Sequence, residues 1–419
     1  MSSNDTDMSS LQRFSRGFAQ TFRSLRSRNF KLYFFGQLIS NSGNWLASVA
    51  LVLLVLKITG SGFAAGVLTA CQFAPVVLLS AWGGAIADRS DKRKMLFLTQ
   101  FLSMVQSFAL AVMAFMEHPP LTGLYILALA GGILLAFDNP LRRSFVTEMV
   151  PTEDISNAVV LYSAIINISR IFGPALAGLL IVTLGYGWCF TIDASSYIAV
   201  LFCIWLMRPS ELYRQTANVK KERLHSEIEA GVRYTAETPS LWIGLVMFAI
   251  IQMLAYNFNV TLPLFVTDAL HSNEGVFTVL YSVFGVGAVA CAFVVARRSM
   301  VRMRHIIIGA VALGVSMLLL SVVPGVPFAI PAVFLVGMGS ILYLTAANAI
   351  VQIEARSEMH GRVLSLQTVV AGGATLIGAP LLGWIADTMG GRMPILIGGL
   401  ASLVAAAFGY FALKRYGTP

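Results

Sequence analysis

Twelve long apolar blocks run through the 419-residue chain, and they constrain its fold more than any other feature. A helix needs about 20 mostly apolar residues to cross the hydrocarbon core of a bilayer. Only 12% of the residues are charged, whereas soluble domains have about 25%. The sequence therefore predicts an all-α membrane protein with twelve transmembrane helices. The blocks cover approximately residues 30–56, 62–87, 95–116, 121–141, 154–184, 187–207, 240–267, 274–296, 305–323, 326–353, 361–387 and 392–413.

One joint between the blocks is much longer than the others. It covers residues 208–239, is rich in charged side chains and separates six blocks from six. The predicted organisation is a cytoplasmic arm over 1–29, two six-helix bundles over 30–207 and 240–413 joined by this linker, and a tail over 414–419.

Lysine and arginine residues fall almost entirely on alternate joints. They occupy the N-terminal arm, every second joint after it and the C-terminal end, whereas Lys57 and Arg392 fall on the other set of joints. Cytoplasmic segments of membrane proteins carry such an excess of positive charge. The pattern predicts that both termini are cytoplasmic, and it accounts for the net charge of +9 without a nucleic-acid partner.

The arm before the first block has an apolar repeat of its own. Leu11, Phe14, Phe18, Phe22 and Leu25 recur at spacings of three and four, with arginines between them. This pattern indicates an amphipathic helix lying on the anionic cytoplasmic leaflet. A disordered basic arm is the alternative.

Two blocks at equivalent places in the two halves share a glycine pattern. At an offset of 205, identical residues coincide: Gly173 with Gly378, Leu176 with Leu381, Gly178 with Gly383, Gly185 with Gly390, and Glu153 with Glu358. The agreement indicates a duplicated six-helix unit, as in secondary transporters that bind substrate near the midplane between repeats. We interpret the glycines and the adjacent prolines as a helix-packing motif, which comprises Gly173, Pro174, Gly178, Gly378, Pro380 and Gly383.

Ionisable residues inside membrane spans are costly and usually functional. Arg170 lies close to the middle of the fifth block, and its expected partners are Asp193 in the sixth block and Asp138 in the fourth. Asp138 is the first candidate for a proton-carrying acid. The alternatives are a structural pair between Asp138 and Arg142 at the helix end, and a static Arg170–Asp193 pair that packs two helices.

The joint after the second block reads GGAIADRSDKRK and covers residues 83–94. It resembles the signature of the major facilitator superfamily at Gly84, Asp88, Arg89, Arg93 and Lys94. The stretches FDNPLRRSFVTEMVP, NAVVLYSAIINISRIFGPALAG and GRVLSLQTVV are similar to the bacterial efflux group that includes the enterobactin exporter and macrolide efflux proteins. The resemblance implies the major facilitator fold, with two pseudo-symmetric six-helix halves in the bacterial inner membrane.

The signature joint is expected to act as a conformational latch. Asp88 can cap or pair with neighbouring helix ends and arginines, in contacts that form in the outward-open state and break in the inward-open one. The alternative is a basic loop that only fixes topology.

Three amides in the first block, Gln37, Asn41 and Asn44, recur at i, i+4 and i+7 and so share one helix face. In the superfamily, helices one and seven are equivalent and line the central cavity. At an offset of 215, Gln252, Tyr256 and Asn259 match the three amides. We expect these six residues to form an uncharged, polar substrate surface. Hydrogen bonds that merely join helices are the alternative.

The remaining motifs narrow the function. There is no GxxxxGK[ST] phosphate loop, catalytic triad or metal-ligand cluster, and the four cysteines form no CxxC motif. We therefore expect neither an enzyme nor a cofactor. The sequence and the resemblance favour a secondary active exporter of a small amphipathic organic molecule, such as a drug or siderophore, coupled to protons and functional as a monomer among membrane lipids. An importer or lipid flippase on the same fold and a non-transporting membrane sensor are the alternatives.

Overall fold

The computed structural model describes residues 22–213, 224–296, 302–356 and 359–416, and that part of the chain folds into helices. Twelve spans are long and apolar enough to cross a membrane, which confirms the predicted all-α fold. The first half contains α2 Arg28–Thr59, α3 Gly62–Arg89, α4 Lys92–Ala114, α5 Leu121–Glu148, α6 Ile155–Thr183 and α7 Tyr186–Leu206. The second half contains α9 Pro239–Leu254, α10 Phe258–Leu264, α11 Glu274–Ala296, α12 Met303–Ser321, α13 Val326–Glu354, α14 His360–Met389 and α15 Met393–Tyr416, with α8 Leu224–Glu237 before it.

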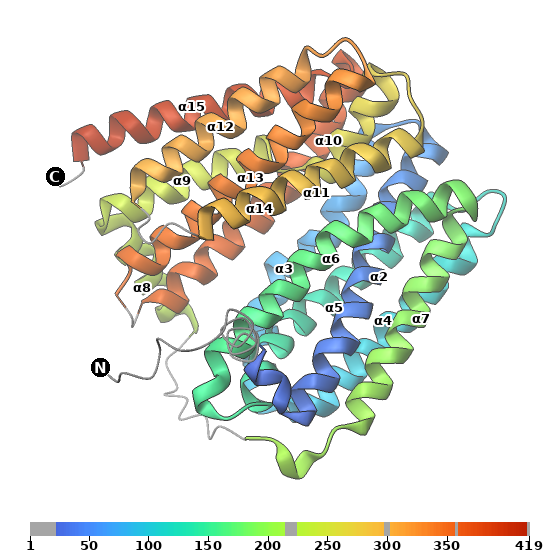
Figure 1. Cartoon of the computed structure of the whole chain (residues 1–419), viewed down its shortest axis with the longest axis vertical. Coiled ribbons are helices and arrows are strands. Elements are labelled where there is room, and N and C mark those ends of the chain that lie inside the picture. The colour runs from blue at the N-terminus through green and yellow to red at the C-terminus, as the bar shows by residue number, and fades with distance from the viewer. Residues whose placement is uncertain (1–21, 214–223, 297–301, 357–358, 417–419) are drawn as a thin grey trace, which may run out of the picture.

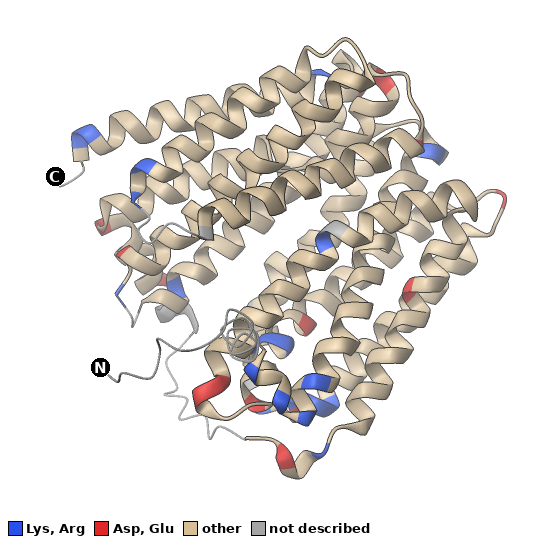
Figure 2. Cartoon of the chain, in the orientation of Figure 1, with Lys and Arg blue, Asp and Glu red and all other residues tan. Residues whose placement is uncertain are grey.

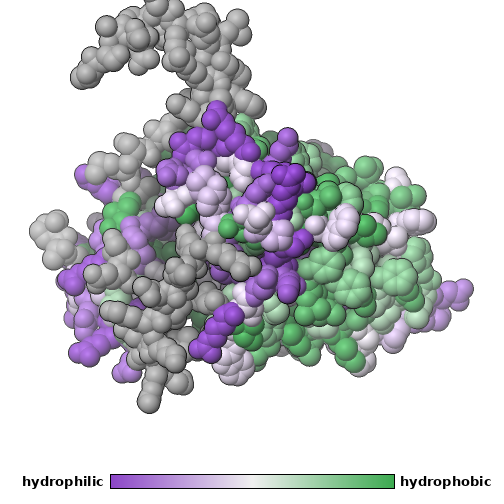
Figure 3. Space-filling model, turned by 90° about the horizontal axis from the view of Figure 1, so that it is seen from below, coloured by the Kyte–Doolittle hydropathy of each residue, from purple (hydrophilic) through white to green (hydrophobic). Residues whose placement is uncertain are grey.

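Large apolar side chains cover the outside of the bundle. Leu78 and Phe293 are each 71% exposed, and many other leucine, valine and phenylalanine side chains face outward with them. Soluble monomers rarely expose so large a continuous apolar surface. Figure 3 shows hydrophobic residues over a broad region of one face, with hydrophilic residues gathered to one side of it. The chain is an integral membrane protein whose outer surface suits lipid.

Most lysines and arginines gather at one end of the bundle, where α2 begins and α15 ends (Figure 2). We call this the basic end and the other the opposite end. The predicted arm reaches the described residues only at its last part. There, the 3-10 helix Arg23–Arg26 is held to the start of α6, because Arg23 pairs with Asp154 and the Ser24 hydroxyl donates to Asn157. Leu11, Phe14 and Phe18 lie outside the described residues.

The fourth span is longer than its apolar block. The sequence suggested an end near residue 141, but α5 continues to Glu148. Arg142 therefore lies inside the helix and is buried, whereas it had been assigned to the helix end. Pro140 also lies inside α5 and cannot donate a backbone hydrogen bond.

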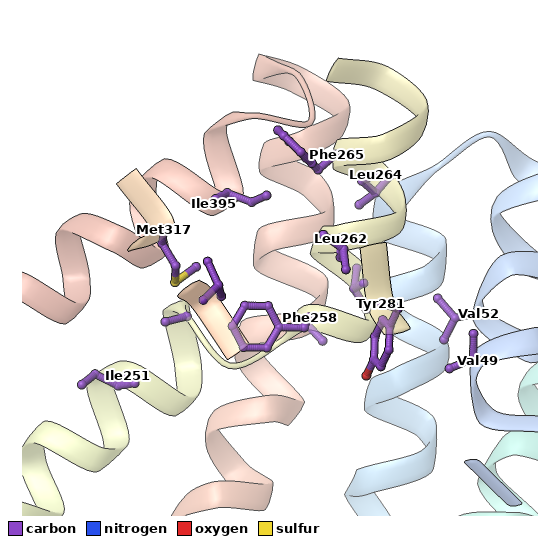
Figure 4. Packing of buried hydrophobic residues seen from close by; sticks show 14 of the residues in the cluster. Val49, Val52, Ile251, Phe258, Leu262, Leu264, Phe265, Tyr281, Met317 and Ile395 are labelled. Atoms are coloured by element: carbon purple, nitrogen blue, oxygen red, sulfur yellow. The ribbon is translucent and has the colours of Figure 1, made fainter. Parts of the chain in front are cut away.

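The seventh span is interrupted. The sequence predicts a single helix over 240–267, but α9 ends at Leu254 and α10 begins at Phe258, followed by a π-helical turn, Phe265–Ala269. Figure 4 shows Ile251 on α9 and Phe258 on α10, on either side of the break. The Asn257 side chain donates to the Met253 carbonyl at 2.9 Å and so satisfies a carbonyl freed by the interruption.

The glycine motif packs both halves in the same way. A Cβ atom on Gly173 would collide with Trp45 and the backbone of α2, and one on Gly378 would collide with the Met253 carbonyl of α9, so each glycine lets its helix approach the first span of its own half. Gly178 and Gly383 instead lie against the other half, at Thr278 of α11 and Gly62 of α3. The matched contacts agree with two pseudo-symmetric halves. In Figure 1, α6 and α11 approach each other toward the opposite end and separate toward the basic end.

Candidate functional site

A buried ion pair lies within α5, among polar side chains of α2 and α4. The Asp138 carboxylate pairs with the Arg142 guanidinium one helical turn away, and both side chains are almost fully buried. The second carboxylate oxygen, Oδ1, accepts hydrogen bonds from Thr99 Oγ1 at 2.9 Å and Gln100 Nε2 at 2.8 Å. Asp138 is therefore surrounded by hydrogen-bond donors, with the Arg142 guanidinium as its countercharge.

Arg142 connects this acid to the amide stripe of α2. Its Nη1 atom donates to Gln37 Oε1 and, at 3.1 Å, to Asn41 Oδ1. The Asn41 amide in turn donates to Gln37 Oε1 at 3.1 Å. Two of the three predicted cavity amides are therefore ligands of Arg142. The spacing of four residues between Asp138 and Arg142 indicates their pair in the sequence, but nothing in the sequence indicates the contacts of Arg142 with the amides of α2.

The third amide of the stripe has a different environment. Asn44 is exposed, and its Nδ2 atom donates to the Tyr197 hydroxyl of α7 at 3.3 Å. Among the described residues, Arg142 donates to Gln37 and Asn41 and not to Asn44. The stripe therefore begins in a buried network at Gln37 and ends at an accessible amide.

The interruption of the seventh span separates the residues matched to the stripe. Gln252 lies on α9, Tyr256 in the break and Asn259 on α10, so they do not share one continuous helical face. The Tyr256 hydroxyl donates to the Ser340 carbonyl at 3.0 Å, and Asn259 Oδ1 accepts from the Tyr281 hydroxyl at 2.7 Å. Gln252 Oε1 is buried without a hydrogen-bond partner.

Arg170 and Asp193 do not form the expected pair. The Arg170 guanidinium carbon lies 5.2 Å from the centre of the Trp45 ring, a cation–π contact with α2. Asp193 is buried on α7, where its Oδ2 atom accepts from the Ser107 hydroxyl at 2.6 Å. Asp138, the other expected partner of Arg170, pairs with Arg142. Neither expected pair of Arg170 is present among the described residues, where Arg170 contacts Trp45 and Asp193 contacts Ser107, two residues that the sequence prediction did not include.

The signature joint anchors helix ends within the first half. Arg93 donates to the carbonyls of Ile204 and Trp205 at the end of α7, both at 3.0 Å, and the neighbouring Lys92 pairs with Glu148 at the end of α5. Lys94 contributes its backbone N–H to the Asp91 cap of α4. Arg89 is exposed in the last turn of α3, and a Cβ atom on the nearby residue Gly84 would meet no atom within 4 Å. The side chain of Asp88 lies outside what the structure describes.

Hydrogen bonds join the two halves at the opposite end. The Asp387 carboxylate of α14 accepts from the backbone N–H groups of Gly62 and Phe63, at 2.5 and 2.9 Å, and from the Ser61 hydroxyl at 2.7 Å. An acid of the second half thus caps the first turn of α3 in the first half. Nearby, the Tyr186 hydroxyl of α7 donates to Glu274 of α11.

The whole described bundle matches one family. The model of the transmembrane secretion effector family aligns with residues 19–416. The chain belongs to this family. Its relatives include a staphyloferrin A transporter of Staphylococcus aureus, 33% identical over 42% of this chain and 44% of that protein, and the multidrug efflux pump Tap of Mycolicibacterium fortuitum, 26% identical over 86% and 89%. The resemblance to the efflux group of the major facilitator superfamily is confirmed.

Solved structures agree on the fold of this family member. A POT family transporter in complex with 5-aminolevulinic acid superimposes with a TM-score of 0.75 and covers 94% of this chain and 97% of that one, at 13% identity. At that identity the likeness concerns the fold alone. The fold and relatives are those of small-molecule transporters and not of enzymes, as predicted.

Proposed function

We propose that this family member is a proton-coupled exporter of small amphipathic organic molecules that works by alternating access. It lies in the bacterial cytoplasmic membrane, with the basic end and both termini in the cytoplasm. The proposed orientation rests on the gathering of lysine and arginine at that end. The proposed direction rests on the efflux-type relatives.

The observation that carries proton coupling is the buried Asp138–Arg142 pair and its link to α2. A proton that reaches Asp138 neutralises the carboxylate and removes the countercharge of Arg142, while the guanidinium keeps its own charge. Its remaining acceptors are then Gln37 and Asn41. Protonation therefore strengthens the hold of α5 on the first span, which is one of the helices that must move between states.

The same amides, Gln37 and Asn41, link the binding of the proton to the binding of the substrate. When Asp138 is ionised, the Arg142 guanidinium is bound by Asp138 as well as by Gln37 and Asn41. The two amides can then form some of their hydrogen bonds with a substrate instead. When Asp138 is protonated, Arg142 has no carboxylate partner, and both amides must accept hydrogen bonds from its guanidinium. A buried guanidinium without these partners would cost several kcal/mol. Proton and substrate thus compete for one network, and that competition is the requirement for antiport.

The test measures transport directly. Cells that express the chain are compared with cells that do not, using cationic, neutral and anionic fluorescent amphiphiles with and without a protonophore. Export predicts lower accumulation that the protonophore abolishes. Higher accumulation would favour an importer, and unchanged accumulation of every probe would favour the non-transporting sensor.

Variants connect the result to the proposed acid. Asp138→Asn is expected to abolish transport driven by a pH gradient in everted vesicles and to leave substrate binding measurable, and Asp138→Glu is expected to retain part of the transport. Glu211→Gln is the matched control, since Glu211 is an exposed acid that pairs with Arg208 outside the spans. Normal pH-driven transport in Asp138→Asn would remove this residue from the mechanism.

A further inference from the structure

One cation in the middle of the spans has no carboxylate to balance it. Arg170 lies near the centre of α6 and is half-buried, and among the described residues it takes part in no ion pair. The acids inside the first half are already engaged, Asp138 by Arg142 and Asp193 by Ser107. Arginine stays charged in proteins, and a charge at this depth in a membrane is costly without a partner.

The Arg170 guanidinium is held in position, but its capacity to donate hydrogen bonds is not fully used. The Trp45 ring supports the guanidinium at 5.2 Å, and the packing of Gly173 against α2 holds the next turn of α6 close to that ring. The Arg170 Nε atom is buried and has no hydrogen-bond partner. A donor held in place with open hydrogen-bonding capacity is what a recognition site for an oxygen anion needs.

The second half of the molecule contributes to the same place. Tyr256 in the broken seventh span and Tyr281 in α11 belong to one aromatic cluster, because Tyr256 contacts the Phe258 ring, Tyr281 contacts the Phe284 ring, and Phe258 and Phe284 contact each other. Both hydroxyls donate to oxygens of their own half, at Ser340 and Asn259. We call this cluster the aromatic wall of the second half; it lies next to α6, the helix of Arg170, because α6 packs against α11. Gly178, two turns further along α6, lies against Thr278 where the halves meet.

We propose that Arg170 binds the carboxylate of the transported molecule, and that the substrates are amphipathic organic acids whose flat apolar body lies among Trp45, Tyr256 and Tyr281. This inference rests on the proposed transport function and narrows its substrate class. A carboxylate accepts two parallel hydrogen bonds from a guanidinium, and aromatic side chains favour a planar apolar group beside it. The site differs from the uncharged amide surface expected from the sequence, because it is organised around a cation.

The experiment compares two probes that differ in charge. Naphthalene-2-carboxylate and naphthalene-2-carboxamide are dialysed against the full chain in lipid nanodiscs, with binding to empty nanodiscs subtracted. We expect the unmodified chain to bind the carboxylate at least about tenfold more tightly than the amide, as a charge-assisted pair implies. Arg170→Gln should raise the Kd of the carboxylate to that of the amide and leave the amide unchanged, whereas Arg170→Lys should retain part of the preference.

Arg143→Gln is the control, since it removes the same charge from an exposed arginine near the basic end and should leave both Kd values unchanged. Equal binding of the two probes, or no measurable binding of the carboxylate, overturns the proposal. Equal weakening of both probes in Arg170→Gln overturns it as well, because it would mean that Arg170 only packs against Trp45. Dialysis needs no proton gradient, so selective binding of the carboxylate together with failed vesicle transport would refute the proposed transport function, while carboxylate binding at Arg170 would remain supported.

Discussion

The contact between Asp387 and the start of α3 gives a quantitative prediction about the conformational equilibrium. Asp387→Asn keeps the size of the side chain but removes its charge and replaces one acceptor oxygen with a donor amide. In the described state, the carboxylate accepts from Ser61, Gly62 and Phe63 across the boundary between the halves. The substitution therefore weakens a contact that exists only while the halves are together at the opposite end.

The size of the effect follows from these hydrogen bonds. A hydrogen bond to a charged group contributes about 1.5–3 kcal/mol, and an anion at a helix N-terminus adds about 0.3–1 kcal/mol. Asp387 is exposed, so water replaces much of what the variant loses. A net destabilisation of about 1–3 kcal/mol remains reasonable, which is about a 5–150-fold shift toward the state that is open at the opposite end.

Double electron–electron resonance measures this shift. Spin labels at Leu184 and Val322 lie at the opposite end on different halves and on exposed side chains, in a background with the four native cysteines replaced by alanine. Asp387→Asn should increase the population of long distances. Asp268→Asn is the control, because Asp268 is an exposed acid at the same end that bonds Thr267 within its own half. An unchanged distribution in Asp387→Asn, or the same change in both variants, would refute the reasoning.

Two further predictions concern stability. Gly383→Ala should lower the melting temperature clearly, because its Cβ atom would collide with the Gly62 backbone, whereas Gly373→Ala in the same helix should not, because no atom lies within 4 Å of the added carbon. Arg142→Gln should destabilise the protein by about 3–5 kcal/mol by leaving Asp138 as a buried unpaired acid, and adding Asp138→Asn should recover part of the loss. Thermal unfolding followed by circular dichroism in detergent checks both, and additive losses in the double variant would argue against the pairing.

The fold could be predicted from the sequence because a bilayer makes strong demands on every span. Each span must be long and apolar, and both properties can be read locally along the chain. The errors occurred where a buried polar residue interrupts that reading. The sequence predicts that the fourth span ends at residue 141, because the charged residues Arg142 and Arg143 follow. Both arginines lie inside α5. The break at Asn257 was missed because apolar residues continue on both sides of it.

The partners of the polar residues could be predicted less well, because they depend on which helices touch. Arg170 and Asp193 were matched as opposite charges on consecutive spans, but α2 lies between them in the packing, with Gly43 against Asp193 and Trp45 against Arg170. The Asp138–Arg142 pair, in contrast, is set by spacing along one helix, and the sequence offers it as an alternative. Sequence separation determines contacts within a helix and leaves contacts between helices open.

The two halves share a packing framework but differ in chemistry. The glycines at 173 and 378, and at 178 and 383, make equivalent close contacts, so the packing framework is symmetric. In the described part of the chain, the ionisable residues deep within the spans, Asp138, Arg142, Arg170 and Asp193, all belong to the first half, and the second half offers tyrosines and amides instead. In the proposed transport cycle, the symmetric framework would allow the halves to move, and the first half would supply the charges. Substitutions at the Asp138–Arg142 pair should therefore alter coupling, whereas substitutions at Arg170 and at the aromatic wall of the second half should alter which molecules bind.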